Sequence, residues 1–182
     1  MLKKIMLSLG VLIVLIAAAY LYLDNRNRTL SPRGEASLSN GELQVDLTYS
    51  RPSIRNRKPF GDETEESIQK YGQYWRLGAN ESTEITFNKD VLIVDQAIKA
   101  GTYRMYAIPG EQYFEIRLNT ELGTWGAFEP DTALDVMSVM IPVNSGEHTE
   151  QFTITTEPLY DTGVKLNIAW GSIQMNLPIN PQ

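Results

Sequence analysis

The sequence predicts a mainly β protein: an antiparallel β-sandwich, jelly-roll-like, with one short helix and an N-terminal transmembrane helix. From residue 42 onward, apolar and polar residues alternate in short segments, and turn-forming residues lie between these segments. Alternation with a period of two is typical of a strand with one buried face. About nine such strands, with very little helix, are typical of a sandwich. No longer segment repeats, which argues against a solenoid or a propeller.

The N-terminus predicts a helix that crosses a membrane. Residues 5–23 contain no charged side chain and follow a basic tail at residues 1–4. At about 1.5 Å per residue this run is roughly 28 Å long, close to the thickness of the hydrocarbon core of a bilayer. Tyr20 and Tyr22 near its end are of a kind that membrane interfaces favour. We expect an uncleaved anchor; the alternative is a signal peptide cut at the Ala17-x-Ala19 site.

The division of the chain follows from this segment. Residues 24–34 are polar and are expected to form a tether, and residues 35–182 are expected to form a single β-sandwich domain. A short basic tail before the apolar run favours an inner-membrane protein with its domain in the periplasm. Signal cleavage would instead release a periplasmic or secreted protein.

The body begins with a strictly alternating strand at residues 42–49, which ends before Pro52 because proline cannot donate to a central ladder. Asp62 suits a helix N-cap and Gly72 a helix end, so we expect a short helix between them. Gly171-Ser172 predicts a type II′ turn, and residues 109–111 a hairpin loop. Further strands are expected at the end of the segment 75–87 and in segments 91–95, 102–108, 112–119, 136–143, 151–155, 164–170 and 173–179.

Composition excludes several kinds of site. The chain has no cysteine, which removes disulfides, thiolate zinc sites and cysteine nucleophiles. The single histidine, His148, lies in a segment typical of a surface turn, and no calcium-loop motif occurs, so we expect no metal and no cofactor. The net charge is −6; without Lys3 and Lys4, 14 basic residues oppose 22 acidic ones. Such an acidic body argues against a nucleic-acid partner.

A candidate binding site lies in the segment 75–87, which is dense in polar residues and leads into an alternating strand. Here Trp75, Arg76, Asn80 and Glu81 combine an aromatic face with hydrogen-bond donors and acceptors, which suit a sugar, a carboxylate or a peptide end. The alternative is a structural network in which Arg76 pairs with Glu81 and Asn80 binds backbone groups. As a catalytic pair Glu81 and Glu84 are weak, because residues three apart in a strand point to opposite faces. The full candidate set is Arg51, Arg57, Trp75, Arg76, Asn80, Glu81, Tyr103, Asn119 and Trp125.

Several motifs give the chain a family resemblance. They are Tyr49-Ser50-Arg51-Pro52-Ser53, Arg57 followed by Phe60-Gly61, Trp75-Arg76-x-Gly78-Ala79-Asn80-Glu81-x-Thr83, Ala100-Gly101-Thr102-Tyr103, Asn119 and Trp125-Gly126. From about residue 31 onward the chain resembles the bacterial family catalogued as domain of unknown function 2911, common in envelope proteins of Bacteroidetes-type bacteria. The resemblance implies a mostly β fold and an exported location, and it implies no activity. Family members often carry a cleavable signal peptide, from which the long apolar run here is a departure.

The leading hypothesis is a membrane-anchored envelope protein whose sandwich binds a small molecule, a glycan or a protein without catalysis. One alternative is a hydrolase that acts on glycans through Glu81. The other is a structural envelope component that assembles through a sheet edge.

Overall fold

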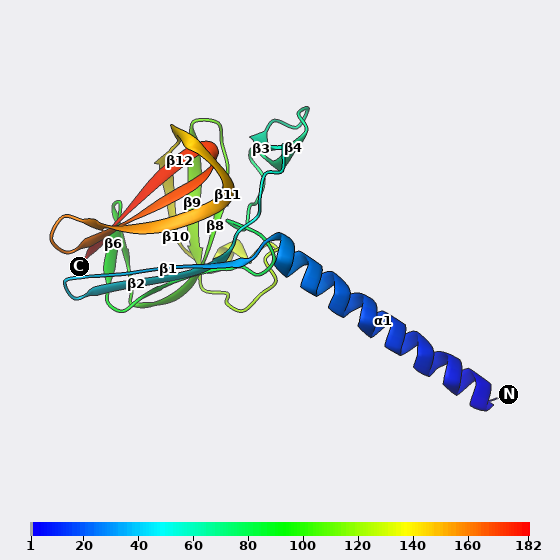
Figure 1. The fold of residues 1–182 in the computed structure, drawn as a ribbon. Coiled ribbons are helices and arrows are strands. Elements are labelled where there is room, and N and C mark those ends of the chain that lie inside the picture. Colours follow the sequence, from blue (N-terminus) through cyan, green and yellow to red (C-terminus); the bar gives the residue numbers. More distant parts are fainter. Residues whose placement is uncertain (1) are drawn as a thin grey trace.

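Two antiparallel sheets face each other in the computed structural model, which describes residues 2–182, and one long helix extends away from them (Figure 1). The six-stranded sheet has the order β1-β2-β5-β8-β9-β10, and the four-stranded sheet β11-β12-β6-β7. The first comprises Arg33–Asn40, Leu43–Ser50, Thr83–Phe87, Gly101–Ile108, Tyr113–Asn119 and Asp135–Pro142. The second comprises Asn144–Leu159, Gly163–Pro181, Val91–Ile93 and Gln96–Ile98. The prediction of a mainly β fold with antiparallel sheets is confirmed. The strands of the larger sheet lie side by side in the order in which they occur in the chain. The structure therefore resembles a jelly roll in having two facing sheets, and not in the order of its strands.

An aromatic cluster fills the core between the sheets. Trp75 stacks on Trp170 with ring centroids 5.7 Å apart and an interplanar angle of 4°. Phe60 meets Trp75 edge-on at 5.0 Å, and Phe152 meets it at 5.1 Å. Alternation on β2 buries Leu43, Val45, Leu47 and Tyr49 against this core, as the sequence predicts. Burial of large rings by both sheets therefore joins the two layers.

The helix predicted between Asp62 and Gly72 is wrong. β3 (Lys58–Gly61) and β4 (Ser67–Lys70) pair in parallel instead. A single turn forms, in which Glu65 accepts a hydrogen bond from the Asp62 amide at 3.0 Å and pairs with Lys58 at 2.6 Å. So short a helix is marginal without tertiary support, and Ile68 gains more by packing on the core from β4. The one short helix of the described body is a 3₁₀ turn, η1 (Thr132–Leu134).

The turn predicted at Gly171-Ser172 is also wrong, because β12 runs through it. Gly171 has φ +62° and lies opposite Thr149, where the register of β11 and β12 shifts. β11 pairs with β12 on both sides of this point, so the glycine bends the strand without reversing it. The segment around His148, predicted as a surface turn, lies within β11, and the His148 side chain is exposed.

The N-terminal helix α1 (Leu2–Leu30) is longer than the predicted apolar run. Its part from Lys3 to Leu30 is long and apolar enough to cross a membrane. Residues 24–30, expected to form part of a tether, continue the same helix, and β1 begins at Arg33. Asp24 and Arg28 are four residues apart, so their side chains lie on one face of the helix, and their ion pair at 2.9 Å supports this extension.

A polar network crosses the outer face of the larger sheet. The hydroxyl of Tyr106 donates to Asp135 at 2.7 Å, and Arg117 and Asn119 donate to the same carboxylate at 3.2 and 2.7 Å. Burial, followed by the hydrogen bond to Asp135, raises the pKa of Tyr106 to about 12.

This shift predicts a loss of stability at high pH. The folded state holds the Tyr106 proton more tightly than the unfolded chain, whose tyrosines titrate near 10. The contribution of protonated Tyr106 to the free energy of unfolding is therefore complete below pH 10, and it is lost as the pH rises toward about 12. The free energy of unfolding, measured with denaturant between pH 10 and 12, should fall more steeply with pH for the wild type than for Tyr106→Phe. Parallel slopes for the two proteins would contradict the assignment.

Candidate functional site

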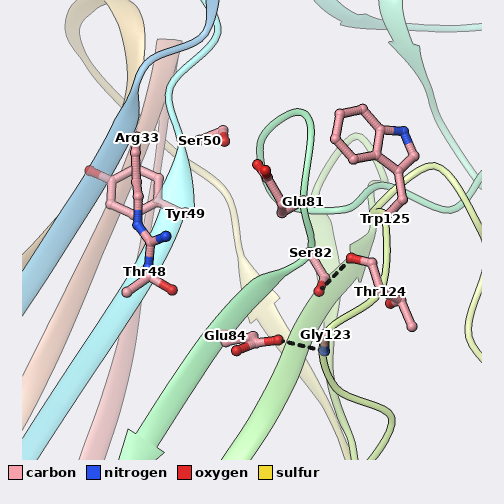
Figure 2. Close-up of a pocket in the computed structure, with 10 residues that line it drawn as sticks. All are labelled: Arg33, Thr48, Tyr49, Ser50, Glu81, Ser82, Glu84, Gly123, Thr124 and Trp125. Atoms are coloured by element: carbon pink, nitrogen blue, oxygen red, sulfur yellow. Dashed lines mark hydrogen bonds between the residues drawn. The ribbon is translucent and has the colours of Figure 1, made fainter. Parts of the chain in front are cut away.

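A pocket of about 410 Å³ opens at one end of the larger sheet. It lies between the start of β1, the end of β2, the start of β5 and the loop that follows β9 (Figure 2). Ten residues line it: Arg33, Thr48, Tyr49, Ser50, Glu81, Ser82, Glu84, Gly123, Thr124 and Trp125.

One wall of the pocket is a short backbone bridge. Glu81 pairs with Trp125, the Ser82 amide donates to the Thr124 carbonyl at 3.2 Å, and the Gly126 amide donates to the Asn80 carbonyl at 2.9 Å. Residues paired directly across such a bridge lie side by side on the same face. The side chains of Glu81 and Trp125 therefore share the pocket face.

Two carboxylates share the pocket, contrary to the prediction that Glu81 and Glu84 point to opposite faces. Glu81 precedes β5, so the strand alternation on which that prediction depends does not reach it. Glu84 accepts a hydrogen bond from the Gly123 amide at 2.9 Å, drawn in Figure 2. The side chain of Glu81 is 46% exposed, which leaves it open to a ligand.

The remaining lining is polar with an aromatic edge. Thr48, Ser50, Ser82 and Thr124 have hydroxyl groups in the lining, and Trp125 presents a ring that is 36% exposed. Ser50 and Ser82 are buried, Ser82 donates to the Thr124 carbonyl, and Thr124 Oγ1 accepts from Arg104, so the Thr48 hydroxyl is the most accessible of the four. Trp125 is the only exposed tryptophan of the three in the chain. The pocket can therefore offer hydrogen-bond acceptors, hydroxyls and a stacking surface to one ligand.

The end of α1 docks on the wall of this pocket. Arg28 Nη1 lies 2.7 Å from Glu81 Oε1, so the predicted pairing of Arg76 with Glu81 is wrong. The Asn80 amide group donates to the carbonyls of Ser31 at 3.1 Å and Asn27 at 3.4 Å. The Asn27 carbonyl also accepts from the Ser31 amide at 2.9 Å, whereas the Ser31 carbonyl lies past the end of the helix, where backbone acceptors lack intrahelical donors. Asn80 thus binds backbone groups, as in the structural alternative, and the groups belong to the end of α1.

The family model described as Protein of unknown function (DUF2911) matches residues 31–179. The chain belongs to the DUF2911 family. No curated protein and no solved structure matches it. The matched region holds every residue that lines the pocket, together with Asn80, whereas α1 lies before it.

Two residues of the Trp-Arg motif in this DUF2911 chain lie away from the pocket. Trp75 is 4% exposed and belongs to the aromatic core. The Arg76 side chain packs against Gly126 in the wall: a Cβ atom added to this glycine would lie 2.8 Å from Arg76 Cδ. Burial lowers the pKa of the Arg76 guanidinium, and the nearby charge of Arg104 lowers it further.

The other candidates bind protein groups. Arg51 donates to Thr153 Oγ1 at 3.1 Å, and Arg57 donates to the Ile54 carbonyl at 2.9 Å. Tyr103 donates to the Lys99 carbonyl at 2.9 Å; Asn119, fully buried, donates to Asp131 and Asp135. Of the nine candidates, the structure brings Glu81 and Trp125 together in the pocket.

Sequence reasoning missed most of the pocket. Arg33, Thr48, Ser50, Ser82 and Thr124 are ordinary polar residues at strand ends, and nothing local marks them. Glu84 is noticeable in the sequence as a carboxylate near Glu81, but the expectation of a strand, in which the two side chains would point to opposite faces, removes Glu84 from the candidates. Within residues 2–182, no group of three or more His, Asp or Glu side chains is placed to hold a metal ion.

Removing the side chain of Asn80 is expected to loosen the end of α1. Asn80 has φ +58°, so Asn80→Gly deletes the amide group without adding backbone strain. We expect a loss of about 1 kcal/mol in the free energy of unfolding, because two carbonyls lose a donor. Hydrogen exchange should accelerate at residues 27–31.

The matched control is Asn56→Gly. Asn56 has φ +59°, is exposed, and its side chain makes no hydrogen bond to any residue in the described range 2–182. Equal exchange at the end of α1 in the two variants would contradict the role of Asn80.

Proposed function

We propose that this DUF2911 protein is a single-pass inner-membrane protein whose periplasmic β-sandwich binds a neutral, polyhydroxylated ligand, such as a glycan, without altering it. The observation that carries the proposal is the pocket itself. An exposed Trp125 ring lies beside two carboxylates and four hydroxyl groups within about 410 Å³.

The chemistry of the lining supports a neutral ligand rich in hydroxyl groups. Carboxylate oxygens accept hydrogen bonds from hydroxyls, and the apolar face of a sugar ring stacks on an indole. The charged groups of the pocket already have partners, since Glu81 pairs with Arg28, Arg33 lies 3.7 Å from Glu35, and Glu84 accepts from the Gly123 amide. A strongly charged ligand would have to displace one of these pairings.

The same contacts favour binding over hydrolysis. A glycosidase needs one carboxylic acid that donates a proton and a second carboxylate that acts as base or nucleophile. In this pocket Glu81 faces a guanidinium and Glu84 accepts from a backbone amide, so both serve as hydrogen-bond acceptors. Glycan hydrolysis through Glu81 remains the competing function, because the two carboxylates share one pocket.

Titration calorimetry tests ligand binding on the full chain in detergent micelles. The probes are neutral trisaccharides with and without N-acetyl groups. We expect saturable heat with at least one probe, and roughly tenfold weaker binding in Trp125→Ala because stacking is lost. Glu84→Gln should also weaken binding.

The control for this experiment is Tyr160→Ala, which removes an 87% exposed ring from the distant turn between β11 and β12. Binding that survives in Trp125→Ala, or an absence of heat with every trisaccharide, would overturn the proposal. Shorter sugars released by the wild type but not by Glu81→Gln would establish the hydrolase instead.

Topology can be tested because the chain has no cysteine. Tyr160→Cys introduces a single exposed thiol on the β-sandwich. A membrane-impermeant maleimide should label it in intact spheroplasts if the domain is periplasmic. Labelling only after the membrane is broken would place the domain inside.

A further inference from the structure

The turn at residues 125–128 exposes two aromatic rings. Phe128 is 69% exposed and Trp125 is 36% exposed, and the Phe128 amide donates to the Trp125 carbonyl at 3.0 Å. Large rings at the tip of a tight turn gain nothing from the fold itself. Two neighbouring exposed rings on one turn form a small apolar surface that could meet a partner.

The turn is held firmly from beneath. Arg104, which is fully buried, donates to the Phe128 carbonyl, and the Tyr74 hydroxyl donates to the Gly126 carbonyl at 2.9 Å. The Gly126 amide in turn donates to the Asn80 carbonyl. The two rings therefore project from a platform fixed at both ends.

This platform lies beside the end of α1. Arg28 contacts Glu81, which is the bridge partner of Trp125. Figure 1 shows the yellow-green loop that contains the turn next to the point where α1 leaves the sandwich. The turn is thus on the side of the body that faces the base of the helix.

The length of the helix sets the level of the turn above the bilayer. Arg28 follows Leu23, the last residue of the uncharged run, by five positions. This is roughly 8 Å along the axis, and the headgroup layer on each side of the hydrocarbon is about 5–8 Å thick. When α1 spans a bilayer, Arg28 and the Glu81–Trp125 bridge beside it therefore lie at the outer edge of the lipid headgroups.

We propose that the turn at residues 125–128 contacts the bilayer that α1 spans, with Phe128 inserted among the headgroups and Trp125 at their boundary with water. Aromatic side chains favour this zone. Of the neighbouring carboxylates, Asp131 caps η1 and Glu121 lies 3.9 Å from Arg104. Glu129, which follows Phe128, is exposed and has to stay on the water side of the turn. The contact depends on α1; because Trp125 also lines the pocket, the membrane contact is tested without any sugar present.

Brominated lipids test this proposal on the full chain in vesicles of phosphatidylcholine and phosphatidylglycerol. Trp75 and Trp170 are buried and α1 contains no tryptophan, so only Trp125 can respond. Lipids brominated at the headgroup end of the acyl chain should quench Trp125, with the share of one tryptophan in three, roughly one third of the emission, as the upper limit. Trp125→Phe should abolish this quenching.

Phe128→Ser leaves every tryptophan in place and should reduce the quenching roughly twofold, because the turn loses its inserted ring. The control is Tyr113→Ser, which removes a 49% exposed ring at the start of β9 and should leave the quenching unchanged. Equal quenching in Phe128→Ser and the wild type overturns the proposal. So does an emission that aqueous iodide quenches and bromolipids do not, and so does shielding of Trp125 from both quenchers, which would indicate a protein partner.

Discussion

Trp75→Ala is expected to lower the free energy of unfolding by about 4 kcal/mol, the largest effect of any single change considered. The indole is 4% exposed and packs between Trp170, Phe60 and Phe152 at centroid distances from 5.0 to 5.7 Å. Alanine would leave a large cavity where the two sheets meet, and neighbouring rings can close it only in part. Denaturant unfolding of the full chain in micelles measures the loss.

Trp75→Phe separates packing from chemistry. A phenyl ring keeps part of the aromatic contact, so its cost should be clearly smaller than that of Trp75→Ala. The folded fraction of both variants should bind trisaccharides as the wild type does, because Trp75 does not line the pocket. A stable Trp75→Ala protein with lost binding would restore this residue to the site.

Arg104→Leu is expected to cost roughly 3 kcal/mol, because it leaves buried acceptors without a donor. The guanidinium donates to Thr124 Oγ1 at 2.8 Å, to the Tyr74 hydroxyl and to the Phe128 carbonyl, and it is fully buried. Leucine fills much of the space but makes none of these bonds. The loop that carries the pocket wall would then lose its main attachment to β8.

Hydrogen exchange of the loop provides the second measurement. Amides at residues 124–128 should exchange faster in Arg104→Leu, whereas those of β2 should be affected only through global stability. Thr124→Val removes a single acceptor and serves as the milder comparison, with an expected cost of about 1 kcal/mol. An Arg104→Leu protein as stable as the wild type would show that the buried charge contributes nothing.

Local patterns predicted the elements whose environment repeats along the chain. β2 alternates between core and solvent over its whole length, so period two identified it. The uncharged run of α1 identified the helix because hydrophobicity over many residues leaves few other structures. The hairpin at residues 109–111 was predicted by turn chemistry, and β8 and β9 flank it.

Prediction was wrong where contacts distant in sequence outweigh local preference. Residues 62–72 have helix-end signals, but pairing with β3 and burial of Ile68 decide their structure. The partner of Glu81 is Arg28, 53 positions away, and no local pattern indicates such a pair. Trp75 is an aromatic residue in a polar segment, and only the packed fold shows that it faces the core.

The junction between α1 and β1 limits the reach of this protein. Only Ser31 and Pro32 separate the two elements; the Pro32 carbonyl accepts from the Arg51 amide, and proline restricts its own backbone. No flexible linker therefore connects α1 to the domain, so the domain cannot move far from the end of the helix. In the proposed single-pass arrangement, a ligand would have to come to the membrane surface, and lateral diffusion would limit the protein to a thin layer along the bilayer.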